Sequence, residues 1–280
     1  MIDRLVLIFK YIIVALVQGI GEILPISSSG HMIIIQSILG LKTSDLTFEI
    51  FLHLASLIAL ILFFRKKIIL MITSFIKYIF IKEKRKDEEI KHYYYLCIHL
   101  IIATIPGALL GLILEEYIAN YLSKMWIVGI FLLLTSSMLF ITTNIKRNKE
   151  LKNLTYFDAF IIGIFQCIGI FPGVSRSGSC LVGGANRKLK QDDAAEFAFL
   201  MALPMMMGSA VINSSNIITA LENKELFIPY IITFIVTLLS TYFSLKLFLK
   251  IIKKQKLSVF AFYCLIIGII SIALGLFIYK

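Results

Sequence analysis

Charged residues are scarce in this chain. Only 16% of its 280 residues are Asp, Glu, Lys or Arg, whereas an ordinary soluble domain has roughly 25%. Hydrophobic residues make up 59%, and their long runs lack the polar stripe of a soluble helix. Runs of about 18 to 23 apolar residues suffice to cross a bilayer core of about 30 Å. A soluble enzyme is therefore excluded, and we predict an all-α integral membrane protein.

Paired cysteines and nucleic-acid signatures are also absent. The four cysteines are scattered in or beside apolar runs, without the spacing of a disulfide framework or a zinc site. The net charge of +11 comes from basic residues between the runs, with no aromatic interleaving, so we expect no nucleic-acid binding. The first apolar stretch has no small-residue cleavage site, and we expect it to be retained.

Six segments are long and apolar enough to be predicted as transmembrane helices. Two further stretches, residues 2–39 and 156–186, are interrupted at 22–29 and 171–179 by proline, glycine and serine, which stop a helix. We predict that each forms a re-entrant helical hairpin, because irregular backbone at that depth must be buried in protein or line a wet cavity. The predicted spans are 45–64, 93–114, 125–143, 194–216, 229–250 and 257–279.

Lysine and arginine gather in four predicted loops. Nine lie in loop 65–91, four in 144–155, three in 186–193 and four in 250–256. All four loops share one side if the six spans alternate and both hairpins return to their own side, and the positive-inside rule makes that side the cytoplasm. Both chain ends then lie outside. In the alternative, residues 2–24 form an ordinary span and the N-terminus lies inside.

A short internal repeat links the two interrupted stretches. The sequence QGIG of residues 18–21 is similar to QCIG of residues 166–169, and Ser28 and Arg176 stand ten residues beyond the leading glutamines. Because the predicted topology places the hairpins on opposite sides, this is the pattern of an inverted repeat, whose broken helices meet near the midplane and build a site. We predict a single membrane domain, residues 1–280, with approximate repeats 1–143 and 156–279.

The first interruption carries a dense polar cluster. Gln18 and Glu22 are one helical turn apart and share a face. A carboxylate in apolar surroundings costs several kcal/mol unless it is paired or bound to a metal, so Glu22 indicates a functional site. The serines after Pro25 are expected to cap a short helix whose N-terminus favours an anion, and His31 is a candidate base. In the alternative, the serines only cap and Glu22 forms a structural pair.

The second interruption holds an arginine among small residues. Arg176 is the only basic residue in its hydrophobic segment, and a buried arginine favours a bidentate anion, either a carboxylate or a phosphate. Gly173, Ser175 and Ser177 are candidates to bind the same phosphate, since glycine lets backbone N–H groups approach closely. A structural ion pair between Arg176 and Glu22 is the alternative, and the two interpretations coexist if the pair opens to admit phosphate.

Both clusters resemble the bacterial undecaprenyl-diphosphate phosphatase family of the bacitracin-resistance type. Residues 18–31, QGIGEILPISSSGH, are similar to its motif of glutamate or glutamine, a second glutamate, proline, serines, glycine and histidine. Residues 172–180, PGVSRSGSC, are similar to its second motif, in which threonine stands where this chain has Cys180. The resemblance extends to the flanking residues 48–56 and 196–208 and covers roughly 2–279.

The resemblance implies an enzyme that removes the terminal phosphate of undecaprenyl diphosphate. The product, undecaprenyl phosphate, carries peptidoglycan and other wall precursors, and resistance to bacitracin follows. The family also implies six spans plus two re-entrant hairpins, a place in the bacterial plasma membrane, and a site open to the extracytoplasmic side. The expected partners are the polyprenyl diphosphate and membrane lipid, and whether the protein forms a homodimer is not decided by the sequence. A divalent cation, Mg²⁺ or Ca²⁺, is implied, with Glu22 and Gln18 as candidate ligands.

Ser28, His31 and Glu22 are the predicted catalytic residues. Ser28 would attack the terminal phosphorus, and His31 would act as base and later as acid. His31 itself and a metal-bound water are the alternative nucleophiles, and Glu49 and His53 are weaker candidates for the site. The candidate phosphate-binding residues are Arg176, Ser175, Ser177, Ser27 and Gly173.

Three other classes of function fit parts of the pattern. A lipid flippase or transporter would share the inverted repeat and the polar groups at the midplane, but it needs no serine beside a histidine. An intramembrane serine protease would leave Arg176 and Glu22 unexplained. The unrelated lipid phosphatases with SGH and SR signatures require a histidine after the arginine, and no histidine follows Arg176 in this chain.

Overall fold

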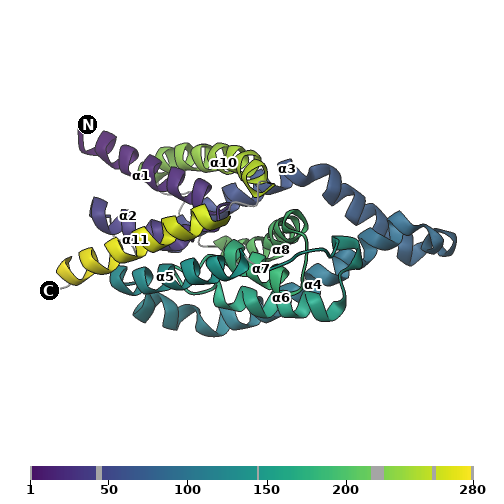
Figure 1. The fold of residues 1–280 in the computed structure, drawn as a ribbon. Coiled ribbons are helices and arrows are strands. Elements are labelled where there is room, and N and C mark those ends of the chain that lie inside the picture. Colours follow the sequence, from purple (N-terminus) through teal and green to yellow (C-terminus); the bar gives the residue numbers. More distant parts are fainter. Residues whose placement is uncertain (1, 42–45, 144, 216–223, 254–256, 279–280) are drawn as a thin grey trace.

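The computed structural model describes residues 2–41, 46–143, 145–215, 224–253 and 257–278. In this part of the chain the protein is a bundle of helices, and its β-type pairing is a single bridge between Lys149 and Leu189. The start of α1 and the end of α11 lie at the same end of the bundle, as Figure 1 shows. At the other end, α3 and α4 continue beyond the remaining helices.

Five helices of the described residues are long and apolar enough to cross a membrane. They coincide with five of the six predicted spans, so the all-helical, multi-pass fold class is confirmed. The remaining predicted span, 45–64, falls within α3 (Leu46–Phe80). Residue 45 of that span, residue 216 of the span 194–216 and residue 279 of the span 257–279 lie outside the described residues. The count of six spans stays a prediction. The five helices are α4 (Glu88–Tyr117), α5 (Met125–Thr142), α8 (Gln191–Ile212), α10 (Lys224–Ile252) and α11 (Leu257–Ile278).

Both interrupted stretches form the predicted pairs of helices. The twelve residues of α2 and eleven of α7 correspond to lengths of about 18 and 16 Å, roughly half of a bilayer core. This length suits a re-entrant hairpin, whose position in a membrane stays a prediction. The first pair is α1 (Ile2–Gly21) and α2 (Ser28–Leu39), and the second is α6 (Tyr156–Ile168) and α7 (Arg176–Asn186). We call the connecting residues 22–27 the first tip and 169–175 the second tip.

The two tips are built alike. A β-carbon on Gly21 would lie 2.9 Å from Ser28 Cα, and one on Gly169, the equivalent position, would lie 2.6 Å from Arg176 Cα. Both glycines therefore let the chain return closely onto the start of the next helix, which a larger residue would prevent. The two tips thus make the same close return at the two equivalent positions. The single domain and the full repeats 1–143 and 156–279 stay predictions.

Small residues bring α5 and α11 together beside the tips. A β-carbon on Gly129 would lie 2.7 Å from Gly268 O, and one on Gly275 would lie 2.6 Å from Trp126 N. Such close backbone approach is how membrane helices gain van der Waals contact, since lipid supplies no hydrophobic driving force between them. The α5–α11 pair then forms one wall behind the second tip, where α5 contacts α7.

Candidate active site

The two tips enclose a cavity of about 250 Å³, which we call the tip cavity. Its walls also include His53 from α3 and two methionines from α8. Six of the nine predicted site residues line it, and Gln18, His31 and Gly173 do not. The lining residues are Gly21, Glu22, Ser27, Ser28, Ser29, His53, Gly169, Ile170, Val174, Ser175, Arg176, Ser177, Met205, Met206 and Ser209.

Glu22 is the centre of the polar network. Its carboxylate oxygen Oε1 forms an ion pair with the guanidinium of Arg176, which is the first residue of α7, directly after the second tip. The second oxygen, Oε2, accepts hydrogen bonds from Ser28 Oγ at 2.8 Å and from Gln18 Nε2 at 3.1 Å. His53 Nδ1 lies 3.5 Å from the same oxygen and 3.1 Å from Gln18 Nε2. The sequence-separated candidates therefore converge on one carboxylate.

The Glu22–Arg176 pair also holds the two tips together. The Glu22 side chain is 4% exposed and the Arg176 side chain 22% exposed, so both charges are largely removed from water. Removing one partner of such a pair typically costs about 3–5 kcal/mol, because the other charge is left uncompensated. The structural ion pair that the sequence allowed is therefore formed, and a phosphate that binds Arg176 has to compete with Glu22.

Ser27 is a structural bridge between the tips. Its hydroxyl caps α2 by accepting the N–H of Gly30 at 3.3 Å, as predicted, and also accepts the N–H of Gly173 at 3.0 Å. A β-carbon on Gly30 would lie only 2.8 Å from Gly173 Cα. Ser27 itself has φ 69° and Gly173 has φ 102°, so both tips use left-handed backbone at this crossing. The Gly173 N–H is thus occupied by Ser27 and does not face the tip cavity.

His31 faces away from Ser28. Its Nδ1 lies 2.8 Å from Ser27 O, and its Nε2 lies 2.9 Å from Tyr263 Oη of α11. The predicted Ser28–His31 pair is not formed, since Ser28 Oγ donates to Glu22 instead. The imidazole ties the first tip to α11, and the group placed to take the Ser28 proton is the Glu22 carboxylate.

The second tip is fixed by α5. Thr135 Oγ1 donates to Gly173 O at 2.9 Å and accepts the N–H of Ser175 at 3.1 Å. Ser175 Oγ caps α7 by accepting Gly178 N at 3.0 Å, and Ser177 Oγ lies 3.2 Å from it. Ser175 and Ser177 therefore line the tip cavity while belonging to the hydrogen-bond network of the tip.

Sequence reasoning missed Thr135 and Tyr263 and ranked His53 low. A threonine inside an apolar run, at Thr135, was the only local signal for the first, and Tyr263 gave none. Cys180, which departs from the family pattern, is buried in α7 with its Sγ 3.8 Å from Gln166 Oε1. It does not line the tip cavity. Cys180 thus belongs to the contact between α6 and α7 and not to the lining of the tip cavity.

A divalent cation fits the tip cavity only through Glu22. The described residues contain no group of three or more His, Cys, Asp or Glu that could hold a metal. Gln18, the second predicted ligand, does not line the tip cavity, and its Oε1 is buried without a hydrogen-bond partner among the described residues. Magnesium is commonly held by one or two carboxylates together with substrate phosphates. The tip cavity offers one carboxylate and several serine hydroxyls. This set suits an ion that is held jointly by the protein and the substrate phosphates, and not one that is held by protein groups alone.

Comparison with known proteins identifies the family. An undecaprenyl-diphosphatase 2 of Bacillus thuringiensis (strain Al Hakam) is 38% identical over 265 residues, which cover 95% of this chain and 97% of the relative. An undecaprenyl-diphosphatase of Oceanobacillus iheyensis is 37% identical over 265 residues, 94% of this chain and 95% of the relative. An undecaprenyl-diphosphatase of Halothermothrix orenii is 36% identical over 269 residues, which cover 96% of this chain and 98% of the relative. Residues 11–270 match the family described as bacitracin resistance protein BacA, and the chain belongs to this family.

Proposed function

We propose that this protein is an undecaprenyl-diphosphatase, which hydrolyses undecaprenyl diphosphate to undecaprenyl phosphate and inorganic phosphate. The observation that carries the proposal is that Ser28, at the start of α2, and Arg176, at the start of α7, both contact the carboxylate of Glu22 in one cavity. A hydroxyl nucleophile, a proton acceptor and a planar cation are the groups that phosphate transfer to an enzyme needs. The names and near full-length similarity of the relatives support the same activity.

Binding of the diphosphate begins with Arg176. The guanidinium offers two parallel N–H groups to phosphate oxygens, and it leaves Glu22 Oε1 when it turns to the substrate. Glu22 then loses its cationic partner, and a carboxylate without such a partner accepts a proton more readily. Substrate binding and activation of the base are therefore one event in this mechanism.

The transfer itself uses Ser28 and Glu22. Ser28 Oγ attacks the terminal phosphorus, its proton passes to Glu22 Oε2, and the bond from that phosphorus to the bridging oxygen breaks. Undecaprenyl phosphate leaves without needing a proton. Water then attacks the phosphoserine, the proton returns from Glu22 to the serine oxygen, and inorganic phosphate is released. His53, which lies 3.5 Å from the same carboxylate oxygen, holds Glu22 together with Gln18.

A magnesium or calcium ion would be held by Glu22 and the phosphates of the substrate, and when bound it supplies positive charge beside the transferred group. Met205 and Met206 give the tip cavity an apolar side. Their flexible thioethers suit the first isoprene units of the lipid. We propose that the enzyme lies in the plasma membrane with this cavity facing the extracytoplasmic side, and the basic loops at the other end of the bundle support this orientation.

The test is hydrolysis of a short prenyl diphosphate, farnesyl diphosphate, by the purified full chain in detergent. The expected products are inorganic phosphate and farnesyl phosphate in equal amounts, with no farnesol. Glu22→Gln is expected to remove activity, while the exposed Glu83→Gln, which makes the same change in charge, keeps it. Release of pyrophosphate, or equal activity of both variants, would contradict the proposal.

A further inference from the structure

A second, larger cavity lies at the opposite end of α8 from the tip cavity. Its volume is about 850 Å³. It includes Gln191 at the start of α8, whereas Met206 of the same helix lines the tip cavity. Fifteen residues of helix separate the two, which is about 22 Å at 1.5 Å per residue. The cavity therefore belongs to the side of the basic loops, and the proposed hydrolysis does not use it.

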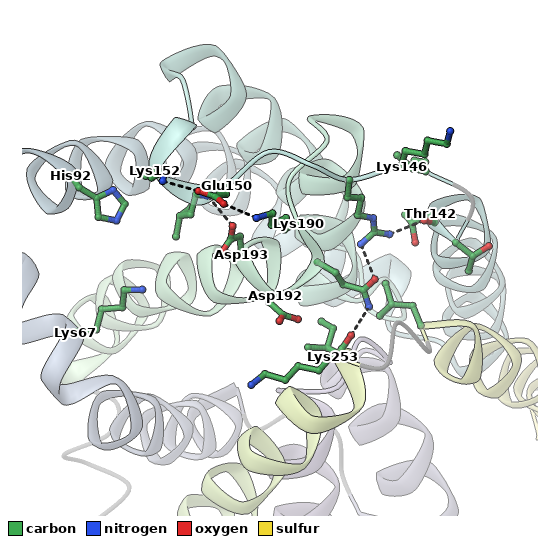
Figure 2. A pocket seen from close by; sticks show the side chains of 17 residues that line it. Lys67, His92, Thr142, Lys146, Glu150, Lys152, Lys190, Asp192, Asp193 and Lys253 are labelled. Atoms are coloured by element: carbon green, nitrogen blue, oxygen red, sulfur yellow. Dashed lines mark hydrogen bonds and ion pairs between the residues drawn. The ribbon is translucent and has the colours of Figure 1, made fainter. Parts of the chain in front are cut away.

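Positive charge dominates the walls of this cavity, which we call the basic cavity. Its lining contains six lysine or arginine side chains and three carboxylates, and Figure 2 shows Glu150 on one side and Lys253 on the opposite side. The cationic residues are Lys67, Lys146, Arg147, Lys152, Lys190 and Lys253, and the acidic ones are Glu150, Asp192 and Asp193.

Two of the three carboxylates are already engaged. Glu150 Oε1 accepts from Lys190 Nζ at 2.6 Å, and Glu150 Oε2 pairs with Lys152 Nζ at 2.9 Å, as Figure 2 shows. These two lysines lower the pKa of Glu150 to about 2. Asp193 Oδ2 accepts the backbone N–H of Leu151 at 2.9 Å. Glu150 is therefore neutralised within its own pair of lysines, and the lining as a whole keeps three more cationic than acidic side chains.

Among the described residues, Arg147 is held in position by an amide and a backbone carbonyl and by no carboxylate. Its Nη2 donates to Thr142 O at 2.7 Å, and its Nη1 donates to Gln191 Oε1 at 3.2 Å. Gln191 Nε2 in turn donates to Ile252 O at 3.2 Å, which joins α8 to the end of α10. Burial lowers the pKa of Arg147, as expected for a cation that is partly removed from water and has no anion beside it.

Lys146 and Lys253 add two more charges. Neither has an ion pair or side-chain hydrogen bond within the described residues. With Arg147 they form a set of three cations around one cavity, and none of the three forms an ion pair within the part of the chain that the structure describes. The wall also contains apolar side chains at the ends of spanning helices, namely Ile145, Leu151, Ile252 and Leu257.

We propose that the basic cavity binds a phosphate-bearing anion, the headgroup of an anionic phospholipid from the adjacent leaflet. A planar arginine and flexible lysines are the groups that bind phosphate. Basic pockets between helices on the cytoplasmic side of a membrane typically take anionic lipid headgroups. The apolar side chains suit the glycerol and the first part of the acyl chains, and soluble phosphate is the other source of the same chemistry.

The test uses the purified full chain in detergent, titrated with phosphatidylglycerol, phosphatidylcholine or inorganic phosphate while the melting temperature is followed. A ligand that binds only the folded protein raises this temperature with its concentration. The key variant is Lys146→Gln/Lys253→Gln, which removes two cations without breaking a bond within the described residues. The matched control is Lys84→Gln/Lys86→Gln, which makes the same charge change on the exposed 3₁₀ helix Lys82–Lys86.

Phosphatidylglycerol is expected to raise the melting temperature more than phosphatidylcholine does. The phosphatidylglycerol concentration that gives half of this rise should be at least roughly tenfold higher for the cavity variant and unchanged for the control variant, since each cation near the surface contributes to anion binding. If inorganic phosphate alone shows this pattern, the site is a phosphate site with a soluble source. Equal responses to the two lipids, or equal responses of the cavity and control variants, would overturn the proposal.

Discussion

Ser27 and Ser28 are neighbours with different partners, and their alanine variants should therefore fail in different ways. Ser28 Oγ donates to Glu22, and Ser28→Ala removes the proposed nucleophile. We expect turnover to fall by at least about 10³-fold, the scale of losing a nucleophile or its base. Its stability should change by about 1 kcal/mol or less, because water in the tip cavity can replace the lost hydrogen bond.

Ser27→Ala should damage the fold instead. The Ser27 hydroxyl accepts the N–H of Gly30 and the N–H of Gly173, and the side chain is buried. Loss of the helix cap costs about 1 kcal/mol, and a buried N–H left unsatisfied costs about 1–3 kcal/mol. A total of about 3 kcal/mol corresponds to a fall of about 6 °C in the melting temperature of a chain of this size.

The assay measures phosphate release and thermal unfolding on the same preparations of both variants. Ser29→Ala is the control, because within the described residues the side-chain hydrogen bond of Ser29 is a long one, with Ser27 Oγ at 3.4 Å. It should resemble the unmodified protein in both measurements. A well-folded Ser28→Ala enzyme that keeps more than about a tenth of the turnover of the unmodified protein would refute the reasoning. Water or His31 would then be the nucleophile that attacks phosphorus.

Four further outcomes are expected. Arg176→Lys should lower kcat/KM by about 10²- to 10³-fold, since lysine keeps the charge but not the planar fork; near-normal hydrolysis would make Arg176 a simple counter-charge. His53→Gln should reduce turnover with little change in melting temperature, whereas His31→Gln should also lower that temperature, because His31 joins Ser27 to Tyr263; equal melting temperatures would contradict this. A chelator should abolish hydrolysis and added Mg²⁺ or Ca²⁺ should restore it; unchanged rates would exclude a required cation. A cysteine at position 2, in a cysteine-free background, should react with an impermeant thiol reagent on intact cells; reaction only after lysis would place the N-terminus inside.

The interruptions and their caps were predictable because their signals are local. Proline, glycine and serine within a few residues stop a helix wherever the rest of the chain lies. Ser27 caps the following helix in the structure, as predicted for the serines after Pro25, and Ser175 caps α7 in the same way, which had not been predicted. The repeated glutamines indicated that the two tips are related, and this relation brought Ser28 and Arg176 to the same carboxylate.

The direction of side chains at the tips was not predictable from one sequence. Ser28 and His31 are three residues apart, a spacing that places them near each other on a helix. In the structure Ser28 turns back toward Glu22, and His31 turns toward Tyr263, 232 residues further along the chain. Partners that distant leave no local pattern, so the assignment of His31 as base rested on spacing alone.

The two roles of Glu22, as partner of Arg176 and as acceptor for Ser28, could also not be predicted from one sequence. Spacing and chemistry indicated that Glu22 and Arg176 belong to one site, but they did not decide between a structural pair and a phosphate site. The geometry allows the structural pair and the phosphate site to form one after the other, because Glu22 uses Oε1 for Arg176 and Oε2 for Ser28. While the pair is closed, the arginine stabilises the carboxylate as an anion and makes it a poor base. A diphosphate that draws Arg176 away removes this restraint at the moment when Ser28 must lose its proton. Water that enters the empty cavity meets a closed pair and a weak base, whereas the substrate opens the pair by the affinity of its own phosphate for the guanidinium.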